Sequence, residues 1–436
     1  MTLKQRRILF YSLIAVFLGL GTGAVLYAQG WRLNFGTLEL GKVGGIYVRS
    51  FPTNTAIKLN GKPTDNKSGI LSPGTLINDL FPRTYALELT VPHFRPWQAH
   101  LAVKPSLVTE IKYAVLLPEQ AALVVPGPLI DFRFLGSQPI IQNASRTLLY
   151  QGQTVPGNTI LGFADNNRVV LTQGGAIYYW YATDNATSTN LSALFRKVGL
   201  RAAPAQVTLD PMNESQVLVE YPKGLALVDV ARASLTTLAT SSTSTVIEAP
   251  GISDFWISWS VYDPKEGVAK IFLYDKVLGT TREMSRALPG HTLKLKWARN
   301  GLLGIVQSDG QTYTYALGAD TLTQIARDGR DLEFSPNGNY LAVLEHDSLE
   351  IFSLVDSDYW RFNPKNIAAA NGLIWYQDNH NLFIKFPDHV GFLGLEDKAM
   401  ENYAEVVVAN KYDYDPDSNR LYFLKDGGIY SLTFPK

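Results

Sequence analysis

Two runs of aromatic residues are the parts of this sequence best suited to holding a ligand. They occupy residues 177–181 (IYYWY) and residues 255–259 (FWISW). Because side chains alternate along a strand, Tyr178 and Trp180 share one face, opposite their two tyrosine neighbours. One such set of rings is expected to fill a β core, and the other to stack on a sugar or on a partner's side chain. The candidate ligand contacts are therefore Tyr178, Trp180, Trp256 and Trp259.

Oxygen-bearing side chains alternate near the carboxyl terminus, at Asp413, Asp415, Asp417 and Asn419. A calcium loop of the EF-hand kind needs a glycine at its sharp turn and a bidentate glutamate at its end. Ser418 and Leu424 stand at those two positions. The run is therefore predicted to be a tight turn between two strands, without a metal.

The other motifs of enzyme chemistry are missing from the sequence. The chain has no cysteine and six dispersed histidines without paired ligand spacing, which excludes thiolate nucleophiles and zinc-thiolate sites. No nucleophile elbow or phosphate-binding loop stands between a strand and a helix. The sequence therefore predicts no catalytic residue, no cofactor and no metal site, and it favours a protein that is not an enzyme without deciding the question.

The composition favours strands and turns. Apolar residues make up 46% of the 436 residues and charged residues only 18%, with 22 Tyr, 20 Phe and 8 Trp. Aromatic and β-branched residues are enriched in strands. The 39 basic and 39 acidic residues balance to a net charge of zero, so no overall field attracts nucleic acid, which we do not expect as a partner.

The amino terminus has the features of a membrane anchor. Residues 8–28 carry no charge, and about 20 apolar residues suffice for a helix to cross a bilayer core. Lys4, Arg6 and Arg7 precede this segment, which keeps the amino terminus in the cytoplasm and sends the bulk of the chain across. The alternative is a cleaved signal peptide, whose apolar region is usually shorter.

A compact β module is predicted after the anchor. Short alternating runs end in turn residues, as at Asn60-Gly61, a dipeptide that accepts positive φ in a tight hairpin. Ser50-Phe51-Pro52, the run Ile57–Gly61, the run Thr75–Leu87, and Phe94 with Trp97 resemble the PEGA domain, a small β module of prokaryotic envelope proteins. The resemblance covers about residues 46–117 and implies a fold and an envelope setting, but no ligand. Asn54 stands where the family has glycine.

One unit recurs over the remainder of the chain: an apolar or aromatic residue, a polar turn, an apolar strand, a second turn and another strand. Ser335-Pro336-Asn337-Gly338 forms the clearest such turn, and its copy resembles blades of Tol-type and WD-repeat propellers. The copies begin at Phe163, Leu209, Trp259, Trp297, Phe334, Trp375 and Tyr414. A spacing of roughly 40 residues predicts a β-propeller of about seven blades. Residues 122–125 or 130–134 are expected to complete the last blade.

The predicted architecture is all-β with one amino-terminal transmembrane helix. In order along the chain we expect a cytoplasmic basic tail at residues 1–7, the transmembrane helix at 8–28, a juxtamembrane linker at 29–44, the PEGA-like module at 45–118 and the propeller at 119–436. The predicted function is that of a membrane-tethered, extracytoplasmic binding or scaffolding protein. Its expected partners are the lipid bilayer, through residues 8–28, and an envelope protein or polysaccharide. An exported hydrolase of peptides or glycans and a self-associating surface-layer element are the alternatives.

Overall fold

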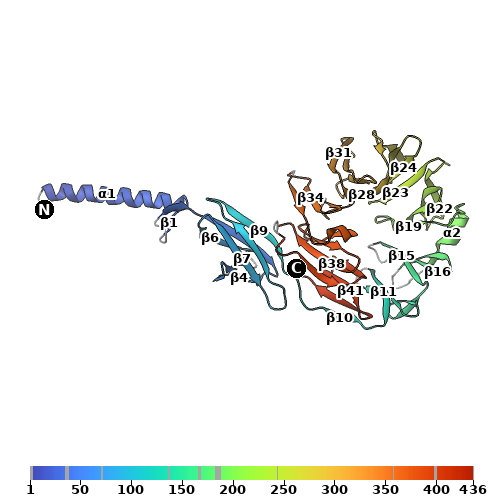
Figure 1. The fold of residues 1–436 in the computed structure, drawn as a ribbon, viewed down its shortest axis with the longest axis horizontal. Coiled ribbons are helices and arrows are strands. Elements are labelled where there is room, and N and C mark those ends of the chain that lie inside the picture. Colours follow the sequence, from blue (N-terminus) through green and yellow to red (C-terminus); the bar gives the residue numbers. More distant parts are fainter. Residues whose placement is uncertain are drawn as a thin grey trace. The chain divides into compact units, whose positions relative to one another are not determined.

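The computed structural model describes residues 3–34, 39–69, 72–135, 138–164, 168–181, 188–242, 244–356, 358–396 and 400–435. The chain divides into two compact units, which we describe separately (Figure 1). The first unit consists of Met1–Gln120 with Pro435–Lys436, and the second of Ala121–Phe434.

The first unit begins with helix α1 (Leu3–Ala28), which has 26 residues and no buried side chain. At 1.5 Å per residue the helix is about 39 Å long. It is long and apolar enough to cross a membrane, and a signal sequence near the amino terminus would also fit this description. The charge-free segment predicted from residue 8 thus belongs to a helix that starts at Leu3 and includes the basic residues.

A hairpin follows the helix where the sequence predicted a linker. Strand β1 (Trp31–Asn34) pairs with β2 (Glu39–Lys42). The next strand, β3, begins at Gly44, and Val43 between them is buried. The glycine-containing segment 41–45 is therefore part of two strands, because its backbone groups find partners there.

The rest of the first unit is a β module of two sheets. One sheet has the order β6-β3-β9 and the other β5-β4-β7-β8. Its strands are β3 (Gly44–Phe51), β4 (Ala56–Leu59), β5 (Lys62–Thr64), β6 (Thr75–Leu80), β7 (Thr84–Thr90), β8 (Trp97–Ala102) and β9 (Val108–Val115). Side chains of both sheets, among them Ile46, Leu87 and Trp97, form one buried core. The predicted Asn60-Gly61 hairpin turn is confirmed, since both residues have positive φ and Leu59 pairs with Lys62.

The second unit is a β-propeller, as predicted. Its described residues form eight sheets, and in seven of them the strands follow one another along the chain. The first sheet contains β11 (Leu129–Leu135), β12 (Gln138–Asn143), β13 (Leu148–Tyr150) and β14 (Gln153–Val155); the second contains β15 (Thr159–Ala164), β16 (Arg168–Gln173), β17 (Ala176–Tyr181) and β18 (Ser188–Asn190). Helix α2 (Leu191–Lys197) follows, with Asn190 as its N-cap.

The third to fifth sheets continue the ring (Figure 1). The third contains β19 (Gln206–Leu209), β20 (Gln216–Tyr221), β21 (Gly224–Asp229) and β22 (Ser234–Thr240). The fourth contains β23 (Val246–Ile252), β24 (Trp256–Asp263), β25 (Val268–Asp275), β26 (Thr280–Glu283) and the short β27 (Leu288–Pro289). The fifth contains β28 (Thr292–Trp297), β29 (Leu302–Gln307), β30 (Thr312–Ala316) and β31 (Thr321–Ala326).

Two further sheets and a closing sheet complete the ring. The sixth contains β32 (Gly329–Phe334), β33 (Tyr340–Glu345), β34 (Leu349–Ser353) and β35 (Tyr359–Phe362); after the short helix η1 (Ile367–Ala369), the seventh contains β36 (Gly372–Trp375), β37 (Asn381–Lys385), β38 (His389–Gly394) and β39 (Ala404–Val408). The closing sheet combines β10 (Ala122–Val125) with β40 (Tyr412–Asp415), β41 (Arg420–Lys425) and β42 (Gly428–Thr433). Leu123 of β10 pairs with Tyr430 of β42.

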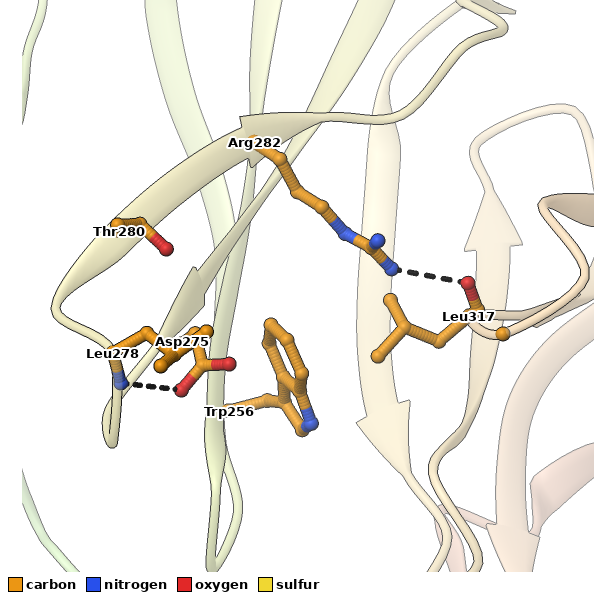
Figure 2. A pocket seen from close by; sticks show the side chains of 7 residues that line it. Trp256, Asp275, Leu278, Thr280, Arg282 and Leu317 are labelled. Atoms are coloured by element: carbon orange, nitrogen blue, oxygen red, sulfur yellow. Dashed lines mark hydrogen bonds between the residues drawn. The ribbon is translucent and has the colours of Figure 1, made fainter.

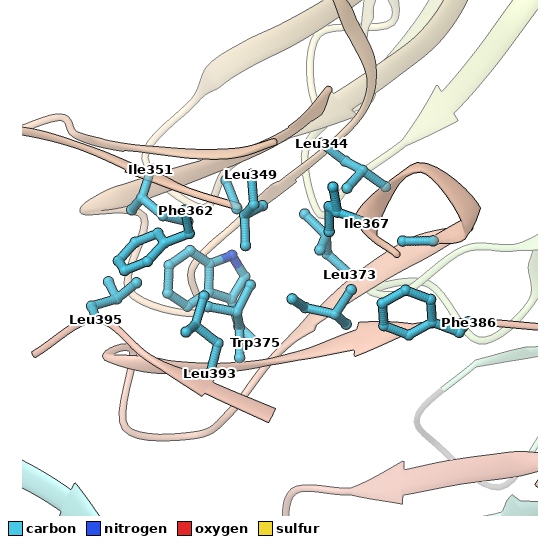
Figure 3. Close-up of a cluster of buried hydrophobic side chains, with 14 residues drawn as sticks. Leu344, Leu349, Ile351, Phe362, Ile367, Leu373, Trp375, Phe386, Leu393 and Leu395 are labelled. Carbon is cyan, nitrogen blue, oxygen red and sulfur yellow. The ribbon is translucent and has the colours of Figure 1, made fainter. Parts of the chain in front are cut away.

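Each core cluster of the propeller joins two neighbouring sheets, which explains why the sheets stack into a ring. Figure 3 shows the cluster between the sixth and seventh sheets, where Leu344 and Leu349 meet Leu373 and Trp375. At the point of closure, Leu129 and Phe132 of the first sheet pack against Tyr422 and Ile429 of the closing sheet. A single sheet cannot bury both of its faces, whereas a closed ring covers them all.

The sequence predicted seven repeat copies, whereas the described residues form eight sheets. The copy that was not recognised is the first sheet, whose strands β13 and β14 have only three residues each. Residues 130–134 were one expected source of the completing strand but instead begin this sheet. The copy assigned to Trp259 was misplaced by one strand, because Trp259 lies within β24, the second strand of its sheet.

Candidate binding groove on the propeller

Three neighbouring hollows lie where the fourth sheet meets the fifth; two are lined by residues of both sheets and one by the fifth sheet alone. In a four-stranded antiparallel sheet, the turn after the first strand and the turn after the third strand lie at the same end of the sheet. In the fourth sheet these two turns adjoin, since the Lys276 backbone N–H donates to the Phe255 carbonyl over 3.0 Å. In the fifth sheet they include residues 298–301 and 317–320. We call the surface formed by the three hollows the inter-sheet groove.

The three hollows have lining residues in common and therefore adjoin one another. One, of about 450 Å³, contains Trp256, Lys296, Trp297 and Glu333 in its lining. A second, of about 300 Å³, lies on Trp256, Arg282 and Leu317. The third, of about 420 Å³, shares Leu317 with the second and Gly301 with the first. The Trp256 side chain thus lines two of the three hollows.

Trp256 is held in place by its neighbours. Its ring lies 6.0 Å from that of Trp297, nearly parallel to it, and the Trp297 Nε1 donates to the buried Ser258 Oγ over 3.0 Å. The Arg282 guanidinium lies 5.6 Å from the Trp256 ring centroid and donates to the Leu317 carbonyl over 3.2 Å (Figure 2). The tryptophan is therefore preorganised, which lowers the entropic cost of binding.

Large apolar side chains flank the groove on the turns of the fourth sheet. Phe255 is 53% exposed, Val277 75% and Leu278 72%. The Asp275 carboxylate accepts hydrogen bonds from the Val277 and Leu278 backbone N–H groups over 2.8 and 2.9 Å. This turn is thus ordered while its two apolar side chains face solvent, as expected of a surface that contacts another molecule.

The structure places the four predicted contact residues in different environments. Of the three whose side chains the structure describes, Trp256 alone lines the groove. Trp259 is 2% exposed and stacks on Phe272 in the core shared with the third sheet; strand alternation turns it away from Trp256, so it is not available as a ligand contact. Tyr178 is half-buried in the second sheet. The side chain of Trp180 lies outside the described residues.

Several groove residues were not singled out from the sequence. Trp297 was noted only as the start of a repeat copy, and Arg282 not at all. A usable signal existed, because Trp256 and Trp297 both stand next to the first turn of consecutive sheets. Recognising this signal requires the correct start of each repeat copy, and the copy assigned to Trp259 starts one strand too late.

Ion pairs join the fifth sheet to the sixth and the closing sheet to the first. Lys294 pairs with Asp331, and Lys296 lies 3.0 Å from Glu333. On the other side, the Lys411 Nζ lies 3.1 Å from the Asp131 carboxylate, which joins the closing sheet to the first sheet. These pairs link neighbouring sheets across the seams of the ring.

Two further charges lie between these pairs. The Lys385 side chain passes Gly372 on the neighbouring strand, where an added Cβ would lie 3.3 Å from the Lys385 Cδ. Burial lowers the pKa of the Lys385 amine, and the carboxylates of Glu333, Asp413 and Asp331 oppose this change. Burial raises the pKa of the Asp413 carboxyl, which accepts a hydrogen bond from the Phe134 N–H over 3.2 Å.

The run of alternating oxygens at residues 413–419 forms the predicted turn. It connects β40 with β41, and the Asp415 carboxylate accepts the Asp417 backbone N–H over 3.0 Å. Asn419 is buried, donates to the Tyr376 hydroxyl over 2.6 Å and accepts from the Tyr414 hydroxyl over 2.8 Å. Its side chain therefore holds the seventh sheet to the closing sheet.

Comparison with known proteins assigns this chain to no family. No protein-family model matches the sequence, and no curated protein matches it. The chain is similar to solved structures described as "Oligogalacturonate lyase in complex with manganese" (10% identity, TM-score 0.42, 72% of this chain and 99% of the other) and "Kluyveromyces lactis Hsv2" (14%, 0.41, 71% and 98%). It is also similar to "Structure of Dos1 propeller" (12%, 0.41, 68% and 75%). The assignment as a propeller rests on the strand pairing.

Proposed function

We infer that this chain is a membrane-tethered binding protein of the cell envelope. In this proposal α1 stays in the bilayer as an uncleaved anchor with its basic residues in the cytoplasm, and a PEGA-like module carries the propeller outside. Lys4, Arg6 and Arg7 at the start of α1, followed by its charge-free stretch, support the orientation. The buried core between the two sheets of the module supports a compact β domain of the PEGA-like kind. The propeller then presents its binding surface to other envelope components.

The inter-sheet groove is the observation on which the binding function rests. It combines a preorganised tryptophan, the Arg282 guanidinium and three exposed apolar side chains at its border. Aromatic and arginine side chains dominate the centres of protein interfaces. Aliphatic side chains such as Val277 and Leu278 fit apolar partner residues better than they fit sugar hydroxyls. The groove therefore favours an extended segment of an envelope protein over a polysaccharide.

Site-specific cross-linking tests this function. A photo-reactive residue replaces Leu278 in the full-length protein in its native membrane, and the matched control replaces Val355, which is 66% exposed in the corresponding turn of the sixth sheet. We expect a discrete cross-linked protein from position 278 and none from position 355. The same product pattern from both positions would contradict a specific groove.

The cross-linked partner is then purified and its affinity measured. Phe255→Ser and Leu278→Ser are expected to weaken binding about tenfold each, since each removes one apolar contact of about 1.4 kcal/mol. Val355→Ser should leave the affinity unchanged. Binding of purified envelope polysaccharide that Phe255→Ser abolishes would instead assign the groove to a glycan, and hydrolysis of either material would indicate an enzyme.

A further inference from the structure

The end of α1 is tied to the β module by several hydrogen bonds. The Val43 N–H donates to the Gly30 carbonyl over 2.9 Å. The Arg32 guanidinium donates to the Tyr27 carbonyl over 2.8 Å, lies 3.7 Å from the Tyr27 ring centroid and pairs with Asp79 of β6 at 2.9 Å. These contacts fix the position of the β1–β2 hairpin at the end of the helix.

The β1–β2 hairpin has two different faces. Arg32 and Gly41 pair with each other and face the module, where Gly41 lies against Phe81. On the opposite face, Leu33 and Leu40 are directly paired and remain 44% and 52% exposed. In water, a cross-strand pair of leucines is stabilised when another apolar surface buries it. Within the described part of the first unit, this face has no covering element.

Aromatic and basic groups surround this apolar face. Trp31 and Lys42 pair on the same face, with the Lys42 Nζ 5.7 Å from the Trp31 ring centroid. Tyr27, 64% exposed, is in the last turn of α1. Tryptophan and tyrosine favour the membrane interface, and lysine favours the phosphates of the lipid headgroups.

A neighbouring loop lies at the same end of the module as the hairpin. The Ser106 N–H donates to the Val43 carbonyl over 2.9 Å, so the loop between β8 and β9 lies beside the end of the hairpin. Leu107 in this loop is 56% exposed, and Lys104 is exposed as well. The end of the module nearest to α1 thus combines exposed leucines with lysines, as interfacial membrane-binding segments do.

We propose that the β1–β2 hairpin is a membrane-contacting foot that lies in the lipid headgroup layer. Leu33 and Leu40 enter the upper acyl region, and Lys42 and Lys104 contact the lipid phosphates. Because the hairpin is fixed to the module, this contact sets the height of the module above the bilayer. The inference depends on the proposed anchoring by α1, since a bilayer at the end of the helix provides the surface.

The absence of cysteine allows a direct test. Single cysteines replace Leu33, Leu40 and, as a control, Asn54, and each is spin-labelled in the full-length protein in phosphatidylcholine and phosphatidylglycerol nanodiscs. Asn54 is exposed after the far end of β3, roughly 25 Å from Gly44 at 3.3 Å per residue. We expect the labels at 33 and 40 to be accessible to oxygen and shielded from a water-soluble nickel relaxant. The label at 54 should show the opposite.

Flotation with liposomes separates this inference from the anchoring itself. Protein that fails to float with liposomes would contradict the anchor and, with it, the foot. Protein that floats while the labels at 33 and 40 remain accessible to nickel would overturn the foot alone. Spin–spin broadening between labels at position 33 would show that a second copy covers this face, which would also overturn the proposal.

Discussion

Two seams of the propeller join similar sheets in different ways. At the seam between the seventh sheet and the closing sheet, five buried aromatic rings contact one another: Tyr376, Phe383, Phe392, Tyr414 and Phe434. At the seam between the fourth and fifth sheets, Trp256 and Trp297 form a single stacked pair beside hollows of up to about 450 Å³. The first seam, which we call the filled seam, is packed with rings. The second also has a buried interior, but it carries surface hollows with room for a ligand.

The filled seam supports the sheet at which the ring closes. This closing sheet combines β10 with the last three strands, so its closure depends on contacts between segments roughly 300 residues apart. Buried contacts of Leu129 and Phe132 with Tyr422 and Ile429 offset the entropy of bringing these segments together. The filled seam holds this sheet from its other side, where the buried Asn419 adds hydrogen bonds to Tyr376 and Tyr414. We therefore expect stability to depend on the first seam and binding on the second.

The largest expected effect comes from removing a ring at the filled seam. Phe383 is fully buried, and its ring centroid lies 4.9 Å from that of Tyr414 and 5.3 Å from that of Phe434. Phe383→Ala should lower the free energy of unfolding by about 3–5 kcal/mol, because it removes a buried ring and leaves a cavity. Denaturant titration followed by circular dichroism measures the loss.

Phe255→Ala at the groove is the matched control, since it removes the same ring from an exposed position. It should change the free energy of unfolding by less than about 0.5 kcal/mol. Equal losses for the two variants would show that the seams do not differ in their contribution to stability.

A smaller, pH-dependent effect is expected from Asp413, next to the filled seam. Burial raises the pKa of its carboxyl in the folded protein, so the folded state binds this proton more tightly than the unfolded state does. The carboxyl therefore costs stability as the pH rises from about 4, the ordinary carboxyl value, through the raised pKa. Asp413→Asn removes this cost and still offers an oxygen to the Phe134 N–H.

The stability of Asp413→Asn relative to the natural protein should therefore increase between pH 4 and pH 7, measured by denaturant titration at each pH. Asp254→Asn, which lies in the groove, should shift stability by less than about 0.5 kcal/mol throughout. A difference for Asp413→Asn that stays constant or shrinks with rising pH would mean that its surroundings favour the charged form.

The sequence predicts the parts of this molecule that depend on local signals. The Ser335-Pro336-Asn337-Gly338 turn is one, since the Ser335 hydroxyl accepts the Tyr340 N–H over 2.9 Å and Gly338 has a φ of 73°. The first sheet was missed because two of its strands, β13 and β14, are too short for a periodic pattern. Trp259 and Trp256 could not be distinguished, because alternation assigns them to opposite faces without saying which neighbouring sheet each face meets.

The groove depends on contacts that no local pattern contains. Arg282 reaches Trp256 from another strand of its sheet, and Trp297 belongs to the next sheet. Their side chains come together only when two sheets pack at a particular angle. The hairpin at residues 31–42 is a similar case, because the turn signals there were interpreted as a linker while the pairing of Leu33 with Leu40 depends on the module beneath.

The smallest effect is expected from the ion pair at the border of the groove. The side chains of Lys296 and Glu333 lie 3.0 Å apart and are 42% and 22% exposed. A double-mutant cycle with Lys296→Met and Glu333→Gln should give a coupling energy below about 1 kcal/mol, because solvent screens partly exposed charges. Denaturant titration of the four proteins provides the value. The pair joins the fifth sheet to the sixth at the border of the groove. A coupling of about 3 kcal/mol would mean that this border contributes to stability as strongly as the filled seam, and the expected division between stability and binding would no longer hold.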